Sequence, residues 1–168
     1  MPHIHTGDGE FDFTVAGYII HDNKTLLIKH KYLPLWTAPS GHIEVTQTPL
    51  DALYTEIKEE SGITKEHLTL VSTGNDRKNL ARPTSHSEMP LPFDIETHPI
   101  SDNHSHINLS YILISDTNNV EPGPGESNTF KWFSLDELDQ FKETNDSIKS
   151  AASYALRIAE EYQHERLQ

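Results

Sequence analysis

The chain has 168 residues, of which 35% are hydrophobic and 23% charged, and it contains no cysteine. Its 26 Asp and Glu residues outnumber its 13 Lys and Arg residues, which gives a formal net charge of −13. The length suits one domain with a substantial core. The absence of cysteine excludes disulfides, thiolate zinc sites and cysteine nucleophiles. So acidic a surface repels nucleic acid and anionic membranes, and a phosphorylated ligand would need metal ions to mask the local charge.

The first residues, MPHIHTGDGEFDF, lack a basic segment followed by an apolar run, so we expect no secretory signal. No apolar stretch approaches the roughly 18 residues that a membrane helix needs. We therefore expect a cytoplasmic protein with one domain over residues 1–168, and neither a membrane nor a nucleic-acid duplex as its partner.

The first half of the chain contains three stretches rich in β-branched and aromatic residues, which predict strands at 11–20, 25–30 and 36–38. A loop is predicted over 41–47. The helix predicted over 49–61 follows Thr48 as N-cap, has Pro49 in its first position, and stops at Gly62. Its apolar residues recur at helical spacing and predict one buried stripe.

The second half begins with a strand predicted over 68–73. Residues 75–105 are polar and contain four prolines, so they are predicted to be irregular, with a short strand left open around 93–97. The strict alternation of 106–114 predicts a half-buried strand. The remaining predicted elements are a strand at 129–133, a short helix after the capping box Ser134–Glu137, and a helix from about Ser147 into the 160s. This mixture predicts an α/β or α+β fold.

Three glutamates, Glu56, Glu59 and Glu60, fall in one sector of the predicted helix beside its apolar stripe. Each pair of like charges at such spacing costs about 0.2–0.5 kcal/mol. The end of a helix also disfavours negative charge, by about 0.3–1 kcal/mol. A cation would remove both penalties, and clustered carboxylates suit Mg²⁺ or Mn²⁺. The alternative is a solvated acidic helix end.

The residues around this helix carry a longer motif. Residues 41–63 resemble the Nudix box, G-x5-E-x7-R-E-U-x-E-E-x-G-U, where U is aliphatic. The matching positions are Gly41, Glu56, Ile57, Glu59, Glu60, Gly62 and Ile63. The preceding TAPSGHIE is similar to the family's PGGxxE segment, with Ser40 in place of the first glycine. The resemblance implies an α/β/α sandwich with a mixed sheet.

The resemblance also implies a reaction: metal-dependent hydrolysis of the pyrophosphate bond in a nucleoside diphosphate linked to another group, by water attack on phosphorus. Glu56 and Glu59 would be catalytic. The metal ligands for Mg²⁺ or Mn²⁺ would be Glu56, Glu60, the backbone carbonyl of Ser40, and Glu59 unless it acts as the base. His42, Glu44 and Glu126 are candidates for substrate contact, and Glu121 is a poorer one. The partner would be a small nucleotide. Family members are often dimers, which leaves a homodimer open.

Two box positions depart from the pattern: Gln47 replaces the expected glutamate and Thr55 the expected arginine. That arginine helps to orient the metal-binding glutamates in the family, so its loss bears on the rate. The departures leave a second hypothesis open, an impaired Nudix domain that binds a nucleotide as a sensor or interaction module. Nothing in the sequence resembles the DNA-binding domain that such regulators carry, which favours the enzyme. A plain acidic structural domain would leave the box spacing as coincidence.

Histidines recur near the irregular segment, at His86, His98, His104 and His106. His104 and His106 would share one face of a strand. A transition-metal site is one interpretation, but the favoured one is that these are ordinary polar surface residues.

Overall fold

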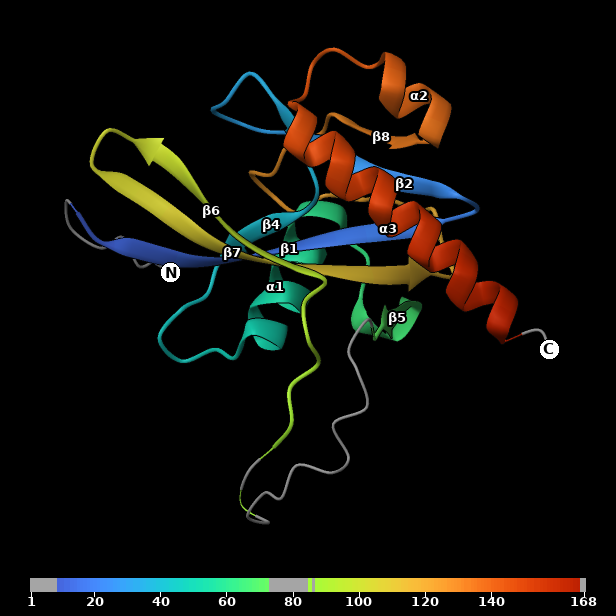
Figure 1. Cartoon of the computed structure of the whole chain (residues 1–168), viewed down its shortest axis with the longest axis horizontal. Helices are drawn as coiled ribbons and strands as arrows, with labels where there is room; N and C mark the ends of the chain where they lie inside the picture. The colour runs from blue at the N-terminus through green and yellow to red at the C-terminus, as the bar shows by residue number, and fades with distance from the viewer. Residues whose placement is uncertain (1–8, 73–84, 86, 167–168) are drawn as a thin grey trace.

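An eight-stranded mixed sheet lies between helices in the computed structural model of the chain, which describes residues 9–72, 85 and 87–166 (Figure 1). The strands are β1 (Phe11–His21), β2 (Lys24–Lys29), β3 (Trp36–Thr37), β4 (Ser40–His42), β5 (Leu68–Val71), β6 (Asp94–Ser101), β7 (His104–Ser115) and β8 (Phe130–Phe133). The helices are α1 (Pro49–Ser61), the 3-10 turn η1 (Lys65–His67), α2 (Leu135–Gln140) and α3 (Asp146–Glu165). The predicted mixed α/β architecture is confirmed.

The sheet is organised around the pairing of β1 with β7. These two strands run parallel, in a register that extends from Phe11 opposite Ser105 to Ile20 opposite Ile114. The other pairs are antiparallel: β2 and β4 also pair with β1, β5 and β6 with β7, and β3 and β8 with β2. Because the β1–β7 pair joins distant parts of the chain, it fixes which side chains of the two halves share a face.

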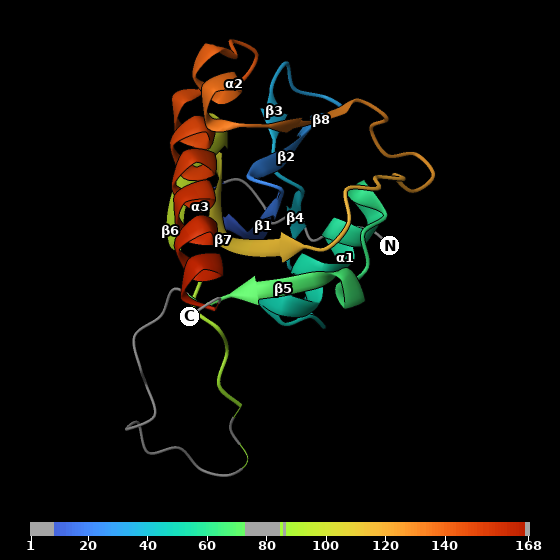
Figure 2. The ribbon, with the colours of Figure 1, turned by 90° about the vertical axis from the view of Figure 1, so that its right-hand side faces the viewer.

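Alternation along β1 divides the core between the two faces of the sheet. Val15 and Ile19 pack with α1, whereas Ala16, Tyr18 and Ile20 pack with α3. Figure 2 shows this arrangement edge-on, with α3 on one side of the sheet and α1 on the other. The residues of α1 that complete the first layer are Ala52, Leu53 and Ile57.

Helix α1 begins and ends where the sequence predicts. Thr48 is its N-cap and forms a capping box with Asp51, which satisfies the first amide groups of the helix. Pro49 occupies the first turn, where its missing N–H costs nothing. Gly62 ends the helix in the left-handed conformation, with φ of 74°, and its N–H donates to the carbonyl of Lys58.

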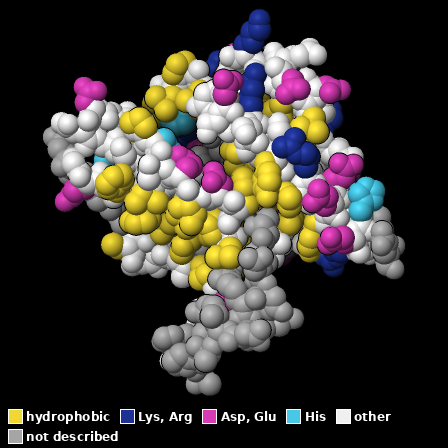
Figure 3. Space-filling view, viewed as in Figure 1, with side chains coloured by type: hydrophobic (Ala, Val, Ile, Leu, Met, Phe, Trp, Pro, Cys, Tyr) yellow, Lys and Arg dark blue, Asp and Glu magenta, His cyan; other side chains and the backbone are white. Residues whose placement is uncertain are grey.

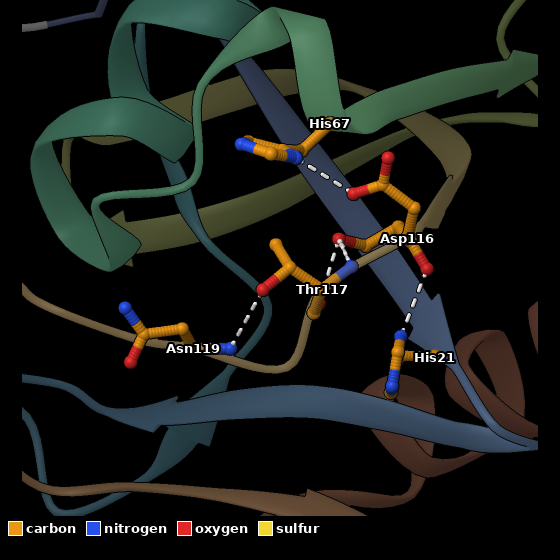
Figure 4. A network of polar contacts seen from close by, with 6 residues as sticks. His21, His67, Asp116, Thr117 and Asn119 are labelled. Atoms are coloured by element: carbon orange, nitrogen blue, oxygen red, sulfur yellow. Dashed lines mark hydrogen bonds and ion pairs between the residues drawn. The ribbon is translucent and has the colours of Figure 1, made fainter.

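The segment that follows β7 returns to the end of α1. Its start is held by a polar network in which His67 Nδ1 lies 2.7 Å from Asp116 Oδ1 and His21 Nδ1 lies 2.9 Å from the carbonyl oxygen of Ser115 (Figure 4). Further along, the amides of Glu121 and Gly123 donate to the carbonyls of Ser61 and Glu59, each at 2.8 Å. The segment therefore satisfies carbonyls that the end of a helix leaves unpaired.

Two predicted loops contain strands. Residues 40–42, which overlap the first two residues of the predicted loop 41–47, form β4 because their backbone pairs with β1. In the predicted irregular segment 75–105, residues 94–101 form β6 along β7, longer than the short strand left open around 93–97. Both strands are imposed by long-range pairing, which residue preferences do not reveal. Residues 73–84 and 86 of the irregular segment lie outside the described residues.

The face that carries α3 mixes acidic, basic and hydrophobic side chains (Figure 3). Exposed hydrophobic residues include Ile95 and Ile100 of β6 and Tyr154 of α3. Among the described residues, no helix is both long and apolar enough to cross a membrane.

Gly62 supplies a test of how closely α1 is held by the segment after β7. A Cβ at Gly62 would collide with the carbonyl oxygen of Glu121, whereas a Cβ at Gly125, whose φ is 84°, would meet nothing within 4 Å. We expect Gly125→Ala to cost about 1–2 kcal/mol from backbone strain alone. Gly62→Ala should cost about 2–4 kcal/mol, because the segment must also move.

Thermal unfolding followed by circular dichroism measures both variants, with about 2–4 °C of melting temperature expected per kcal/mol at this length. Equal losses for Gly62→Ala and Gly125→Ala would show that the segment does not confine the helix end.

Candidate active site

Helix α1 presents its three glutamates beside β4. Glu56 and Glu60 are partly buried and Glu59 is exposed. Glu56 lies directly against Gly41: a Cβ at Gly41 would collide with the Glu56 carboxylate. Glycine at this position therefore lets the helix carboxylate approach the strand backbone.

Glu60 meets the same strand one residue earlier. The backbone N–H of Ser40 donates to Glu60 Oε2 at 2.8 Å. Two carboxylates of α1 are thus held against consecutive residues of β4. The structure brings the predicted residues Ser40, Gly41, Glu56 and Glu60 together, with Glu59 on the same turn of the helix.

A fourth carboxylate comes from the segment between β7 and β8. Glu126 is close enough for its charge to act on both Glu56 and Glu60. Its Oε2 forms a 2.7 Å ion pair with Nζ of Lys31, in which Glu126 is partly buried and Lys31 is exposed. Lys31 was not predicted, because it follows β2 and belongs to no spacing pattern in the sequence. Its charge also acts on Glu60.

The pKa values of the helix glutamates are strongly raised. Burial, followed by the charges of Glu60, Glu59, Glu126 and Glu44, raises the pKa of Glu56 to about 8. Burial is also the main cause for Glu60, whose pKa rises to about 7 although the Ser40 amide and Lys31 oppose the shift. Such shifts mean that the folded chain crowds negative charge into a poorly solvated place.

The two departures from the box contact each other. Gln47 Nε2 donates to Thr55 Oγ1 at 3.4 Å, and Gln47 Oε1 accepts from the amide of Glu44 at 3.2 Å. Thr55 Oγ1 in turn donates to the carbonyl of Asp51 at 2.7 Å. A neutral hydrogen-bonded pair thus stands where the box has two charged residues, and neither departure leaves a charge without a partner.

The remaining predicted residues lie at different distances from this cluster. Glu44 is near enough to act on Glu56. His42 follows Gly41 on β4, and alternation directs it to the opposite face of the sheet, where its Nε2 lies 3.5 Å from Asp12 Oδ2. Glu121 is exposed and accepts from Asn119 Nδ2 at 2.9 Å.

The donor set beside β4 consists of oxygen atoms, which are the ligands that Mg²⁺ and Mn²⁺ prefer. Its raised pKa values are those of carboxylates that a cation would stabilise in the charged form. These residues therefore fit a hard divalent ion. Ligand atoms of three of these carboxylates do not all lie within 4.8 Å of one another. Within the described residues, a group that meets this distance consists of Asp12, His104 and His106.

Known proteins resemble this chain in sequence and fold. A Bacillus subtilis (strain 168) protein named "Putative ADP-ribose pyrophosphatase YjhB" is 33% identical over 79 residues, which are 47% of this chain and 35% of that protein, so the match spans about a third of the relative's length. The crystal structure of a NUDIX-family hydrolase from Clostridium perfringens is 30% identical, has a TM-score of 0.79, and covers 88% of this chain and 97% of its own.

A Caenorhabditis elegans Ap4A hydrolase shares the fold at 18% identity, with a TM-score of 0.59 over 92% of this chain and 98% of its own. A family model described as the NUDIX domain matches residues 12–154 of the chain. Because that match covers most of the 168 residues and includes the carboxylate helix and the strand it packs on, the chain belongs to the Nudix hydrolase family.

Proposed function

We propose that this chain is a Mg²⁺- or Mn²⁺-dependent pyrophosphohydrolase that cleaves a nucleoside diphosphate linked to another group. The observation that carries the proposal is the position of Glu56 and Glu60, with raised pKa values, against consecutive residues of β4 whose backbone leaves room for them. The charge of Glu126 acts on both carboxylates. The name of the Bacillus subtilis relative supports the same substrate class, and Nudix enzymes generally use divalent metals.

The carboxylates of Glu56 and Glu60 would hold the metal, with the Ser40 carbonyl as a further ligand. The bound ion would neutralise the phosphates and polarise the phosphorus–oxygen bond. The exposed Glu59 would accept a proton from a water molecule as that water attacks phosphorus and the bond from phosphorus to the bridging pyrophosphate oxygen breaks, or it would complete the ligand set. Lys31, which pairs with Glu126, would add positive charge near the pyrophosphate.

The contact between Gln47 and Thr55 favours a second candidate, a nucleotide-binding module with little turnover. A neutral pair with a 3.4 Å hydrogen bond holds its neighbours less firmly than a charged pair does. The retention of all three helix glutamates favours the enzyme, because a binding module has no need to crowd carboxylates at a cost in stability.

Replacing the exposed glutamate tests the enzyme directly. We expect Glu59→Gln to lower kcat/KM at least a hundredfold, because the amide can neither take a proton nor bind the ion as a carboxylate does. The measurement is release of nucleotide or phosphate from nucleoside triphosphates, ADP-ribose, nucleotide sugars and dinucleoside polyphosphates, with Mg²⁺ and with Mn²⁺. Glu161→Gln, an exposed change on α3, is the matched control and should keep full activity.

If the unaltered chain hydrolyses no substrate of the panel but still binds nucleotide, the enzymatic function is wrong and the binding module is supported. Equal rates for Glu59→Gln and the unaltered chain would remove Glu59 from the reaction.

The raised pKa of Glu56 predicts a pH-dependent stability in the absence of metal. Between its ordinary value of 4.5 and about 8, the folded chain holds a proton that the unfolded chain has lost. The free energy of unfolding must therefore fall as pH rises through this window. Glu56→Gln removes the titrating group, so in EDTA at pH 8 it should raise the melting temperature by about 2–4 °C, as expected for about 1 kcal/mol.

Thermal melts from pH 5 to pH 9 in EDTA, repeated with excess Mg²⁺ or Mn²⁺, measure this effect. The metal should stabilise the unaltered chain more at pH 8 than at pH 5, and should stabilise Glu56→Gln less. Glu161→Gln should follow the unaltered chain throughout. The same pH slope in Glu56→Gln and in the unaltered chain would contradict the assignment.

A further inference from the structure

A second group of ligating side chains lies on the face of the sheet opposite α1. Asp12 comes from β1, His42 from β4, His98 from β6, and His104 and His106 from β7. The strand registers place them together: Asp12 lies opposite His106, which in turn lies opposite His98, and His42 lies opposite Thr14. Alternation then directs all these side chains to the face that carries α3.

This group lies toward the starts of β1 and β7, and α3 packs on the later part of β1, at Ala16, Tyr18 and Ile20 (Figure 1). In the space-filling view of this face, patches of histidine surface near the left of the molecule are small and partly covered by their neighbours (Figure 3). Asp12 itself is 2% exposed. The Asp12 carboxylate is therefore shielded from water, and imidazole rings lie beside it.

The ligand atoms of three of these residues converge. His104 Nε2 lies 3.0 Å from Asp12 Oδ2, and one ligand atom each of Asp12, His104 and His106 lie within 4.8 Å of one another. Two ligands of one tetrahedral ion, each about 2.0–2.1 Å from it, lie about 3.3 Å apart. Small side-chain rotations would therefore gather the three atoms around a common ion.

The imidazoles of this group are crowded together, with Asp12 Oδ2 3.0 Å from His104 Nε2 and Glu96 Oε1 2.9 Å from His98 Nδ1. The ring of His106 has its centroid 5.0 Å from that of His42, and 5.4 Å from those of His98 and His104. His106 is partly buried among these three rings. Among the described residues, His104 Nε2 meets no hydrogen-bond partner of suitable geometry.

The chemistry of this donor set differs from that of the glutamates on α1. Two imidazoles and one carboxylate suit borderline transition metals such as Zn²⁺, Co²⁺ and Ni²⁺, whereas Mg²⁺ prefers oxygen donors alone. We propose that Asp12, His104 and His106 form a second metal site, which binds a divalent transition-metal ion, with His42 or His98 within reach as a further ligand. The ion would join β1 to β7 where their parallel pairing begins.

This proposal differs from the favoured sequence interpretation, in which these histidines are ordinary polar surface residues. His98, His104 and His106 take part in one cluster with a buried aspartate, while His86 lies outside the described residues. The site does not depend on the proposed hydrolysis, and either can hold without the other.

Zn²⁺ binding to the chain, freed of any affinity tag and stripped of metal with a chelator, tests the proposal. We expect calorimetric titration to give one Zn²⁺ equivalent of micromolar or tighter affinity that survives in Glu56→Gln/Glu60→Gln, where the oxygen site is disabled. His104→Asn and His106→Asn should each weaken this equivalent at least tenfold. His164→Asn, an exposed change on α3, is the matched control and should leave the affinity unchanged.

Co²⁺ supplies a second measurement that needs no variant of the cluster. Visible absorption bands of Co²⁺ bound to nitrogen and oxygen ligands, displaced by one equivalent of Zn²⁺, should appear in the unaltered chain and in Glu56→Gln/Glu60→Gln. Absence of both Zn²⁺ and Co²⁺ binding would overturn the proposal and leave a histidine–aspartate ion-pair cluster. Binding that persists undiminished in the folded double variant His104→Asn/His106→Asn would overturn it equally.

Discussion

The close approach of α1 to β4 is the constraint on which the carboxylate site depends. Ile57 is fully buried against β1, and Gly17 on that strand leaves room for it, since a Cβ there would collide with Ile57. Once Ile57 is fixed, its neighbour Glu56 and the residue one turn on, Glu60, must face the backbone of β4. Apolar packing therefore holds two carboxylates where solvation is poor. This burial disfavours their charged form, which raises both pKa values.

The parts of this arrangement that local chemistry determines could be predicted from the sequence. The bounds of α1 follow from Thr48, Pro49 and Gly62, each of which acts within one turn of the helix. The strand β1 follows from its own β-branched and aromatic residues. The joint position of Glu56 and Glu60 follows from helical periodicity alone. Once the helix and its buried stripe are known, the glutamates have few other places to lie.

What the sequence could not predict depends on pairing between distant segments. Ser40–His42 is a strand only because β1 lies beside it, and the prolines around β6 obscure a strand that β7 imposes. Lys31 and Glu126 form an ion pair although 95 positions of sequence separate them, and no spacing pattern predicts this contact. The histidine cluster needs the parallel register of β1 and β7, which places Asp12 opposite His106. Neither segment alone contains a spacing pattern that would predict a cluster of its histidines.

The two groups of ligating residues share one short strand and differ in chemistry. On β4, Gly41 faces the glutamates of α1, while the next residue, His42, faces Asp12 on the other side of the sheet. Oxygen donors lie on one face and mainly nitrogen donors on the other, so each group would select a different class of ion. Because β4 is held from both faces, an ion bound at the histidines would also steady the backbone against which Glu56 and Glu60 pack. A carboxylate site whose box lacks its charged pair has particular need of such support, since Gln47 and Thr55 hold each other only by a neutral 3.4 Å contact.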